Sequence, residues 1–446
     1  MKKTLSCILA CLLMTLSAFS LAACTQKDDA AGVYFLNFKP ESAKAYEKIA
    51  DDYYKEKGVK VKVVTAAANT YEQTLKSEIA KKNAPTIFQI NGPIGYNNWK
   101  NYCADLKDTK LYSYLSDKNL AIREGDGVYG IPYVVEAYGI IYNKEITDRY
   151  FALKNRQTQV NSMDEVNKYN KLRILVEDMT KHKKDLGIDG VFASTSMLSG
   201  EDWRWQTHLM NIPLYYEFAE NEQYDDPTVA GLNTTDITFK YADKFKNIFD
   251  LYINNSTTQK TLLGSKSVAD SMAEFALGKA AMVQNGTWGY SQIADVKGNK
   301  VKAENVKFLP IYLGIDGEED QGLCVGTENY FAINKNASAE QQKASLDFLE
   351  WLYGSEKGKK YVSEELGFTT PFNTFTEKET PNDPLAKETV RWMNKEKINT
   401  IPWIFTAFPS ENFKTELGSL LLGYAQGSNT WDEVKAGAIK LWKSER

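Results

Sequence analysis

The chain has 446 residues, of which 43% are hydrophobic and 25% charged; these values are typical of a globular protein, and the length suits two domains. Its formal net charge of −4 comes without a block of Lys and Arg, so nucleic acid is not an expected partner. The cysteines are few and scattered, which excludes a disulfide-rich scaffold.

The N-terminus has the pattern of an export signal. Residues 1–23 combine two early lysines, an apolar run over 5–19 and small residues before Cys24. The run is shorter than the roughly 20 residues that a membrane span needs. Leu-Ala-Ala-Cys at 21–24 resembles the bacterial lipobox, which implies cleavage before Cys24, diacylation of this residue and a lipidated tether over 24–31. The alternative is an ordinary signal peptide in which Cys24 is incidental.

Strands and helices alternate in the first part of the mature chain, which predicts an α/β fold. Proline opens the first helix and glycine ends it, and a Thr-x-x-Gln pattern has the form of a capping box for the second. The expected elements are a strand over 33–38, a helix from Pro40 to Gly58, a strand over 59–63, a helix over 70–82 and a strand over 86–90.

Helical patterns dominate residues 160–300, and strand-like runs return further on. A second capping box starts a helix at Ser338 that ends at Gly354. The expected later elements are strands over 306–312 and 330–333 and helices over 410–442 that break near Gly427.

Motifs for cofactors and metals fail on context. Gly125–Gly130 matches G-x-G-x-x-G, but no strand precedes it and no helix follows, so we expect no nucleotide cofactor. The acidic loop 316–320 lacks EF-hand spacing, and two His with Cys103 and Cys324 are too scattered for zinc. These two cysteines are either buried thiols or a pair. We expect no cofactor and no metal.

Three segments carry a resemblance to a known family. They contain Y-G-I-P and Y-N-K within 127–144, G-K-A-A-M and G-x-W within 275–288, and G-F-T-T-P at the end of 326–371. In order and spacing these segments resemble the carbohydrate-binding solute-binding lipoproteins of bacterial ABC importers, the family that includes the maltose-binding proteins.

The resemblance implies an α/β fold of two lobes, with a hinge of three crossings and a ligand cleft between the lobes. By the family pattern the crossings fall near 134–138, 306–310 and 354–358. Lobe one is then expected to comprise residues 32–135 and 309–355, and lobe two residues 136–308 and 356–446.

The resemblance also implies a sugar site. Aromatic rings cover the apolar faces of a sugar, while carboxylates and amides bind its hydroxyl groups. Trp288 matches the stacking position and Glu136 a sugar-contacting glutamate; their alternatives are a core tryptophan and a hinge salt bridge. Trp203 aligns roughly with another stacking position, and Trp205 is its neighbour; either could instead pack on the following helix.

Further candidates follow the expected strands, because ligands bind at strand C-termini in open α/β sheets. Lys39 and Glu41 follow the first strand, where the alternative is a plain helix N-terminus. Asn91 and Tyr96 follow the third. The weaker candidates by alignment are Asn285, Glu328, Asn329, Trp403 and Phe413.

These features predict a monomeric, lipid-anchored, extracytoplasmic receptor that captures an oligosaccharide by hinge closure and delivers it to an ABC permease, without enzymatic activity. One alternative is the same fold binding a peptide, polyamine or phosphorylated metabolite; the other is a secreted glycosidase, for which no carboxylate pair is marked. Residues 60–100 and 190–240 depart from the maltose-binding pattern, so the sequence does not name the sugar.

Overall fold

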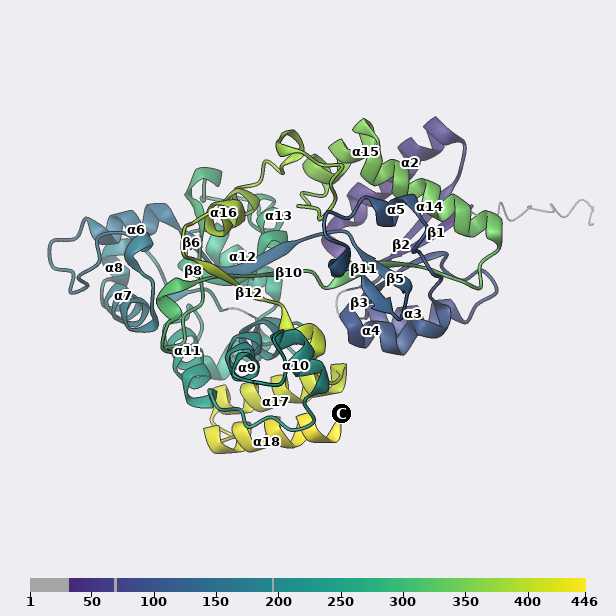
Figure 1. Ribbon diagram of the computed structural model, residues 1–446. Helices are drawn as coiled ribbons and strands as arrows, with labels where there is room; N and C mark the ends of the chain where they lie inside the picture. Colours follow the sequence, from purple (N-terminus) through teal and green to yellow (C-terminus); the bar gives the residue numbers. More distant parts are fainter. Residues whose placement is uncertain (1–31, 68–69, 195) are drawn as a thin grey trace, which may run out of the picture.

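The computed structural model describes residues 32–67, 70–194 and 196–446, which form two α/β lobes, each built on a six-stranded sheet (Figure 1). The strands of the first sheet, in spatial order, are β2 (Val61–Thr65), β1 (Val33–Asn37), β3 (Ile87–Asn91), β11 (Asn329–Ile333), β5 (Gly127–Pro132) and β4 (Ile122–Glu124). Those of the second are β12 (Asn399–Pro402), β10 (Gln321–Gly326), β6 (Glu136–Asn143), β8 (Ala280–Gly286) and β7 (Gly190–Phe192), with β9 (Val306–Leu309) paired to β6.

Helices cover both faces of the first sheet. Two separate hydrophobic clusters, one on α2 and α14 and the other on α3 and α4, pack against its strands. The helices of this lobe are α2 (Ala43–Lys57), α3 (Tyr71–Ile79), α4 (Gly92–Trp99), α5 (Lys110–Ser113), α14 (Ala339–Gly354) and α15 (Glu356–Lys360), with the 3₁₀ turn η1 (Pro40–Ser42) and the π-helical turn η10 (Tyr361–Glu365).

The second lobe is larger and more helical, and α17 and α18 form its C-terminal layer (Figure 1). Its helices are α6 (Lys144–Phe151), α7 (Tyr169–Lys181), α8 (Lys183–Leu186), α9 (Met210–Ala219), α10 (Pro227–Asn233), α11 (Ala242–Asn254), α12 (Val268–Ala276), α13 (Tyr290–Ala294), α16 (Pro384–Met393), α17 (Glu411–Gln426) and α18 (Trp431–Ser444). Its short turns include the π-helix η5 (Arg204–Leu209) and the 3₁₀ turns η7 (Thr287–Gly289) and η12 (Ile404–Ala407).

Local sequence explains α2 well. Tyr46, Ile49, Ala50 and Tyr53 recur at helical spacing and are buried against the sheet. Gly58 ends the helix in the left-handed region, at φ 72°, and its N–H donates to the Tyr54 carbonyl. The predicted helix and its glycine stop are confirmed.

Of the two capping boxes predicted from the sequence, one forms and the other does not. The box at Ser338 is confirmed, because its hydroxyl accepts from the Gln341 N–H and the Gln341 side chain accepts from the Ser338 N–H. The box predicted at Thr70 is wrong, because the Thr70 hydroxyl donates to the Ala67 carbonyl instead and caps no helix N–H.

The lobe boundaries differ from the sequence expectation at two places. Residues 309–355 were expected in lobe one, but β10 pairs with β6 and β12 in the second sheet, so the chain crosses between Gly326 and Asn329. Residues from 356 onward were expected in lobe two, yet Tyr361 and Phe372 belong to the core of the first lobe. The last crossing therefore lies between Phe375 and the start of α16.

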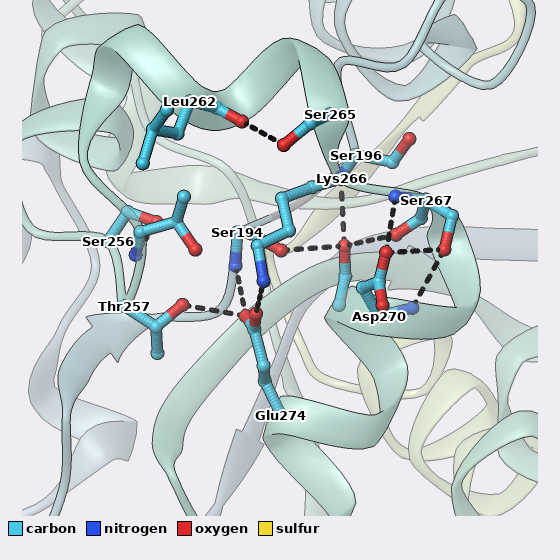
Figure 2. Close-up of polar contacts among 12 residues, drawn as sticks. Ser194, Ser196, Ser256, Thr257, Leu262, Ser265, Lys266, Ser267, Asp270 and Glu274 are labelled. Atoms are coloured by element: carbon cyan, nitrogen blue, oxygen red, sulfur yellow. Dashed lines mark hydrogen bonds and ion pairs between the residues drawn. The ribbon is translucent and has the colours of Figure 1, made fainter.

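A polar network anchors α12 in lobe two (Figure 2). The Glu274 carboxylate accepts from the Ser194 N–H at 2.8 Å, from the Thr257 hydroxyl at 2.6 Å and from Lys266 Nζ at 3.1 Å. Ser267 and Asp270 form the capping box of the helix. These bonds tie the segment after β7, the loop after α11 and α12 together.

Cys103 and Cys324 are buried free thiols, one packed in the first lobe and one on β10 of the second. None of the helices in the described ranges combines the length and the hydrophobicity that a membrane crossing requires.

Candidate functional site

A cavity of about 530 Å³ lies between the lobes, beside the segment that joins β5 to β6. Both lobes and the crossings contribute to its wall. The lining residues are Glu41 and Ser42 on η1, 134–136 at the first crossing, Thr287, Trp288, Tyr290 and Ser291 after β8, 363–369 before the last crossing, and Asn382, Asp383 and Ala386 at the start of α16. A space of this size is typical of small-molecule sites.

An ion cluster lies in the wall of the cavity. Lys39 Nζ contacts both carboxylate oxygens of Glu136, at 2.8 and 2.9 Å, and lies 3.8 Å from Glu41 Oε1. Asn37 fixes the loop, because its Nδ2 donates to the Lys39 carbonyl and its Oδ1 accepts from the Lys39 N–H. The cluster joins the end of β1 to the start of β6, so it links the lobes.

Burial and mutual attraction set the charges of this cluster. Lys39 and Glu136 are each 5% exposed. Burial alone would lower the pKa of Lys39, but the carboxylates of Glu136 and Glu41 raise it above its ordinary value. Burial raises the pKa of Glu41, against the attraction of Lys39. Lys39 is therefore a cation held between two carboxyl groups. Of these, Glu41 binds a proton more readily than an exposed glutamate does.

Lobe two contributes Trp288 to the wall, with further aromatic rings packed around it. Trp288 follows β8, and its indole folds back over Gly286, where a Cβ would lie 2.2 Å from the ring. The ring centroid of Trp288 lies 5.8 Å from that of Trp203, 5.4 Å from His208 and 6.2 Å from Trp403. Glycine at 286 is therefore needed for the position of the indole.

His208 packs between Tyr138 and the tryptophans of this aromatic group. Its ring stacks on Tyr138 at 4.3 Å, and the Tyr138 hydroxyl donates to the His208 carbonyl. Burial and the nearby cation of Arg204 hold the pKa of His208 well below its usual range. A neutral imidazole thus packs under the tryptophans. His208 was not predicted from the sequence, because a single histidine has no local pattern that marks it.

The structure brings some of the predicted residues together. Glu41, Glu136 and Trp288 line the cavity, with Lys39 and Trp203 in contact with them. Asn285 lies beneath this group, fully buried, and accepts from Arg204.

Other predicted residues lie elsewhere. Asn91 and Asn329 face each other on β3 and β11, where Asn329 Nδ2 donates to Asn91 Oδ1 at 3.3 Å, and neither lines the cavity. Trp205 does not line it either, because its ring is 1% exposed, packs on Phe249 and donates to the Ser196 carbonyl.

The expectation for Tyr96 also needs correction. Its ring stacks on Tyr129 at 5.3 Å and its hydroxyl donates to Glu124, so it belongs to the packing of the first lobe. Position after a strand was not enough to bring the side chain to the cavity, since α4 begins at once and turns Tyr96 inward.

The contribution of the last crossing to the cavity was not predicted from the sequence. Residues 363–369 and Asp383 line the cavity, although G-F-T-T-P was noticed only as a family motif. Asp383 caps α16 by accepting from the Leu385 and Ala386 N–H groups, and burial raises its pKa. An Asp before a Pro is a helix-start signal, and only the fold shows that this helix begins at a cavity.

The chemistry of the site is that of recognition. The Trp288 indole, carboxylates and hydroxyl groups converge on one space between the lobes, which suits a ligand with apolar faces and polar edges. Within the described ranges, no group of His, Cys, Asp and Glu is arranged to hold a metal ion. Cys24, the expected lipidation site, lies outside the described residues.

Known structures share this fold. RafE in complex with raffinose matches with a TM-score of 0.68 and 19% identity, covering 93% of this chain and 99% of that chain. A chitin oligosaccharide binding protein matches with 0.70 and 16%, covering 93% and 97%. Maltose-bound MalE3 of T. maritima matches with 0.67 and 13%, covering 92% and 99%.

Sequence comparison adds a family. No curated protein matches the chain. The family model described as bacterial extracellular solute-binding protein matches residues 48–388, more than half of the chain. With a cavity between two lobes joined by several crossings, the protein belongs to the bacterial extracellular solute-binding protein family.

Proposed function

We propose that this protein captures an oligosaccharide in the cavity between its lobes, closes over it and delivers it to an ABC permease in the membrane. Family membership already places the chain outside the cytoplasm. The proposal adds that a lipid on Cys24 anchors the protein and that it acts as a monomer. Two acyl chains suffice for stable anchoring.

One observation carries the carbohydrate assignment: Trp288 and the Lys39–Glu136–Glu41 cluster belong to the same cavity. An indole covers the C–H face of a sugar ring, and paired carboxylates accept hydrogen bonds from its hydroxyls. Trp203, in contact with Trp288, extends the aromatic surface. Of the similar structures, RafE holds raffinose and MalE3 holds maltose. The third is a chitin oligosaccharide binding protein.

Closure would follow from contacts made by both lobes. Glu41 belongs to the first lobe and Trp288 to the second, so a ligand that touches both favours the closed arrangement. No bond is broken in this process. The protein is proposed to bind and release its ligand unchanged.

A thermal-shift screen tests the proposal on residues 25–446. Raffinose, maltotriose, chitotriose, spermidine and short peptides are added separately, because a ligand that binds only the folded state raises the melting temperature. A rise with an oligosaccharide, and its recovery uncleaved after incubation, supports the proposal. Cleavage would favour a glycosidase, and a shift with none of the sugars would contradict carbohydrate binding.

A second candidate ligand is an organic polycation. Glu41, Glu136 and Asp383 line the cavity, and no Lys or Arg is among its described lining residues. Lys39 behind the wall offsets only part of this negative charge. A melting shift with spermidine that disappears in high salt, without any shift from neutral sugars, would favour this candidate.

A further inference from the structure

Arg204 is a fully buried cation in lobe two. It begins η5 and has no exposed surface. Among the described residues it forms no ion pair, and its Nη1 has no hydrogen-bond partner. Burial lowers the pKa of Arg204, with Glu201 acting in the opposite direction. Removing a charge from water without a counter-ion is unfavourable, so a contribution to stability does not explain a buried arginine at this position.

The contacts of Arg204 lead to the aromatic wall. Its guanidinium lies 3.9 Å from the ring centroid of Trp203, in cation–π contact. Trp203 is only half-buried, and its other ring neighbours are His208 at 4.9 Å and Trp288 at 5.8 Å. The buried cation thus holds one face of a partly exposed indole that touches the cavity-lining Trp288.

Asn285 fixes the guanidinium in turn. Arg204 Nη2 donates to Asn285 Oδ1 at 3.1 Å, and Asn285 Nδ2 lies 3.0 Å from Met272 Sδ. Asn285 is in β8, directly before the turn that carries Trp288. The end of β8 therefore positions both tryptophans. It holds Trp288 through the backbone of the following turn, and it holds Trp203 through Asn285 and Arg204.

We propose that Arg204 is a positioning residue that holds the Trp203 indole against Trp288 and so pre-organises the aromatic wall for ligand. This inference rests on the proposed binding of an oligosaccharide in the cavity. Arg204 itself does not touch the ligand. A side chain fixed before binding loses less conformational freedom when the ligand arrives, which increases affinity.

The test uses Arg204→Met, which keeps an unbranched side chain and removes both the charge and the planar stack. Proteins labelled with 5-fluorotryptophan are compared by ¹⁹F NMR, with Trp203→Phe to assign the Trp203 signal among the 9 tryptophans. In Arg204→Met the Trp203 signal is expected to broaden or shift, while the core signal of Trp205 stays. The melting temperature is expected to stay or rise, because an unpaired buried charge has been removed.

Affinity is measured by calorimetry with whichever of raffinose, maltotriose or chitotriose raises the wild-type melting temperature. Arg204→Met is expected to weaken binding by ~10-fold through loss of pre-organisation. Arg204→Lys keeps the charge without the planar group and is expected to weaken it as well. Arg173→Met, at an exposed arginine paired with Glu177 on α7, is the control and should change neither signal nor affinity.

The outcomes separate this inference from the proposed function. An unchanged Trp203 signal in Arg204→Met overturns the positioning role, whatever the ligand. Parallel changes of the Trp203 and Trp205 signals with a fall in melting temperature also overturn it, since they indicate a structural role. A selective change at Trp203, in a protein that binds none of the three sugars, upholds the positioning role and rejects the carbohydrate assignment.

Discussion

Individual tryptophans in lobe two have different environments although they lie in similar polar sequence contexts. Trp205 is fully buried and donates to the Ser196 carbonyl, whereas Trp288 is half-buried at the cavity, and its Nε1 has no partner among the described residues. The difference predicts opposite consequences for substitution at the two positions.

Trp288→Ala is expected to weaken ligand binding by ~2–4 kcal/mol, as for a central aromatic contact in a binding site. Calorimetry with the sugar identified by the melting screen measures this loss. Trp205→Phe is the control, since removing a buried hydrogen bond and some packing should lower stability without a comparable loss of affinity. Unchanged affinity in Trp288→Ala would remove this residue from the site.

Asp202 predicts a pH dependence of stability. Burial raises its pKa from 3.8 to about 6, and α17 packs so closely that a Cβ at Gly418 would lie 1.9 Å from its Oδ2. Between these two values the folded protein binds more protons at Asp202 than the unfolded chain does. The stability contributed by this group is therefore complete below its ordinary pKa of 3.8 and is lost as pH rises through about 6.

Asp202→Asn should raise the free energy of unfolding at neutral pH by ~1–3 kcal/mol, and the difference from wild type should shrink as the pH falls to the ordinary carboxyl pKa. Urea unfolding at several pH values measures it. Asp225→Asn, in an exposed loop, makes the same charge change as a control. A difference from wild type that does not vary with pH would contradict the assignment.

At the scale of the elements, α12 depends on one carboxylate. Glu274 accepts hydrogen bonds from Ser194, Thr257 and Lys266, and its side chain is 12% exposed (Figure 2). Glu274→Ala leaves buried donors without a partner and is expected to cost ~2–4 kcal/mol of unfolding free energy. Denaturant titration measures the cost. Glu177→Ala, in an exposed ion pair, should cost less than ~1 kcal/mol, and an equal effect of both would refute the role of the network.

Element prediction from the sequence succeeded where the pattern was local. The strands at 33–38 and 86–90, the helix ending at Gly58 and the C-terminal helices around Gly427 all appear in the structure. The strand β10 was not predicted, because Gln321–Gly326 lacks alternation and its partners β6 and β12 are remote in sequence. Because this pairing is non-local, the crossing expected near 306–310 was misplaced, and it lies after β10 instead.

For the whole molecule, the described arrangement has a close contact between the lobes at Gly92 and Thr406. A Cβ at Gly92, at the start of α4, would lie 2.8 Å from the Thr406 Cβ on η12. The lobes are therefore so close here that a side chain at position 92 would collide with Thr406. Close contact between the lobes is what the closed form of a hinged receptor requires. A large side chain at this contact should therefore oppose closure.

Thr406→Trp is expected to favour the open arrangement and to weaken binding, because the ligand must then drive an unfavourable closure. Small-angle scattering should show the radius of gyration fall when the wild type binds its sugar, and not in the variant. Thr261→Trp, at an exposed turn away from the interlobe contact, should behave as wild type. Equal compaction of all three proteins would reject this contact as part of the closed form.

The sequence by itself determined the class of the molecule. Composition, strand–helix alternation and three family segments predicted an α/β receptor, because secondary-structure patterns and family motifs depend on residues that are close together in the sequence. Tertiary structure decided which candidates share one cavity. Glu136 meets Lys39 across 97 positions and the ring of Trp203 lies 5.8 Å from that of Trp288, while Trp205 and Tyr96 turn into cores. Such contacts depend on strand pairing and helix rotation, which no local pattern specifies.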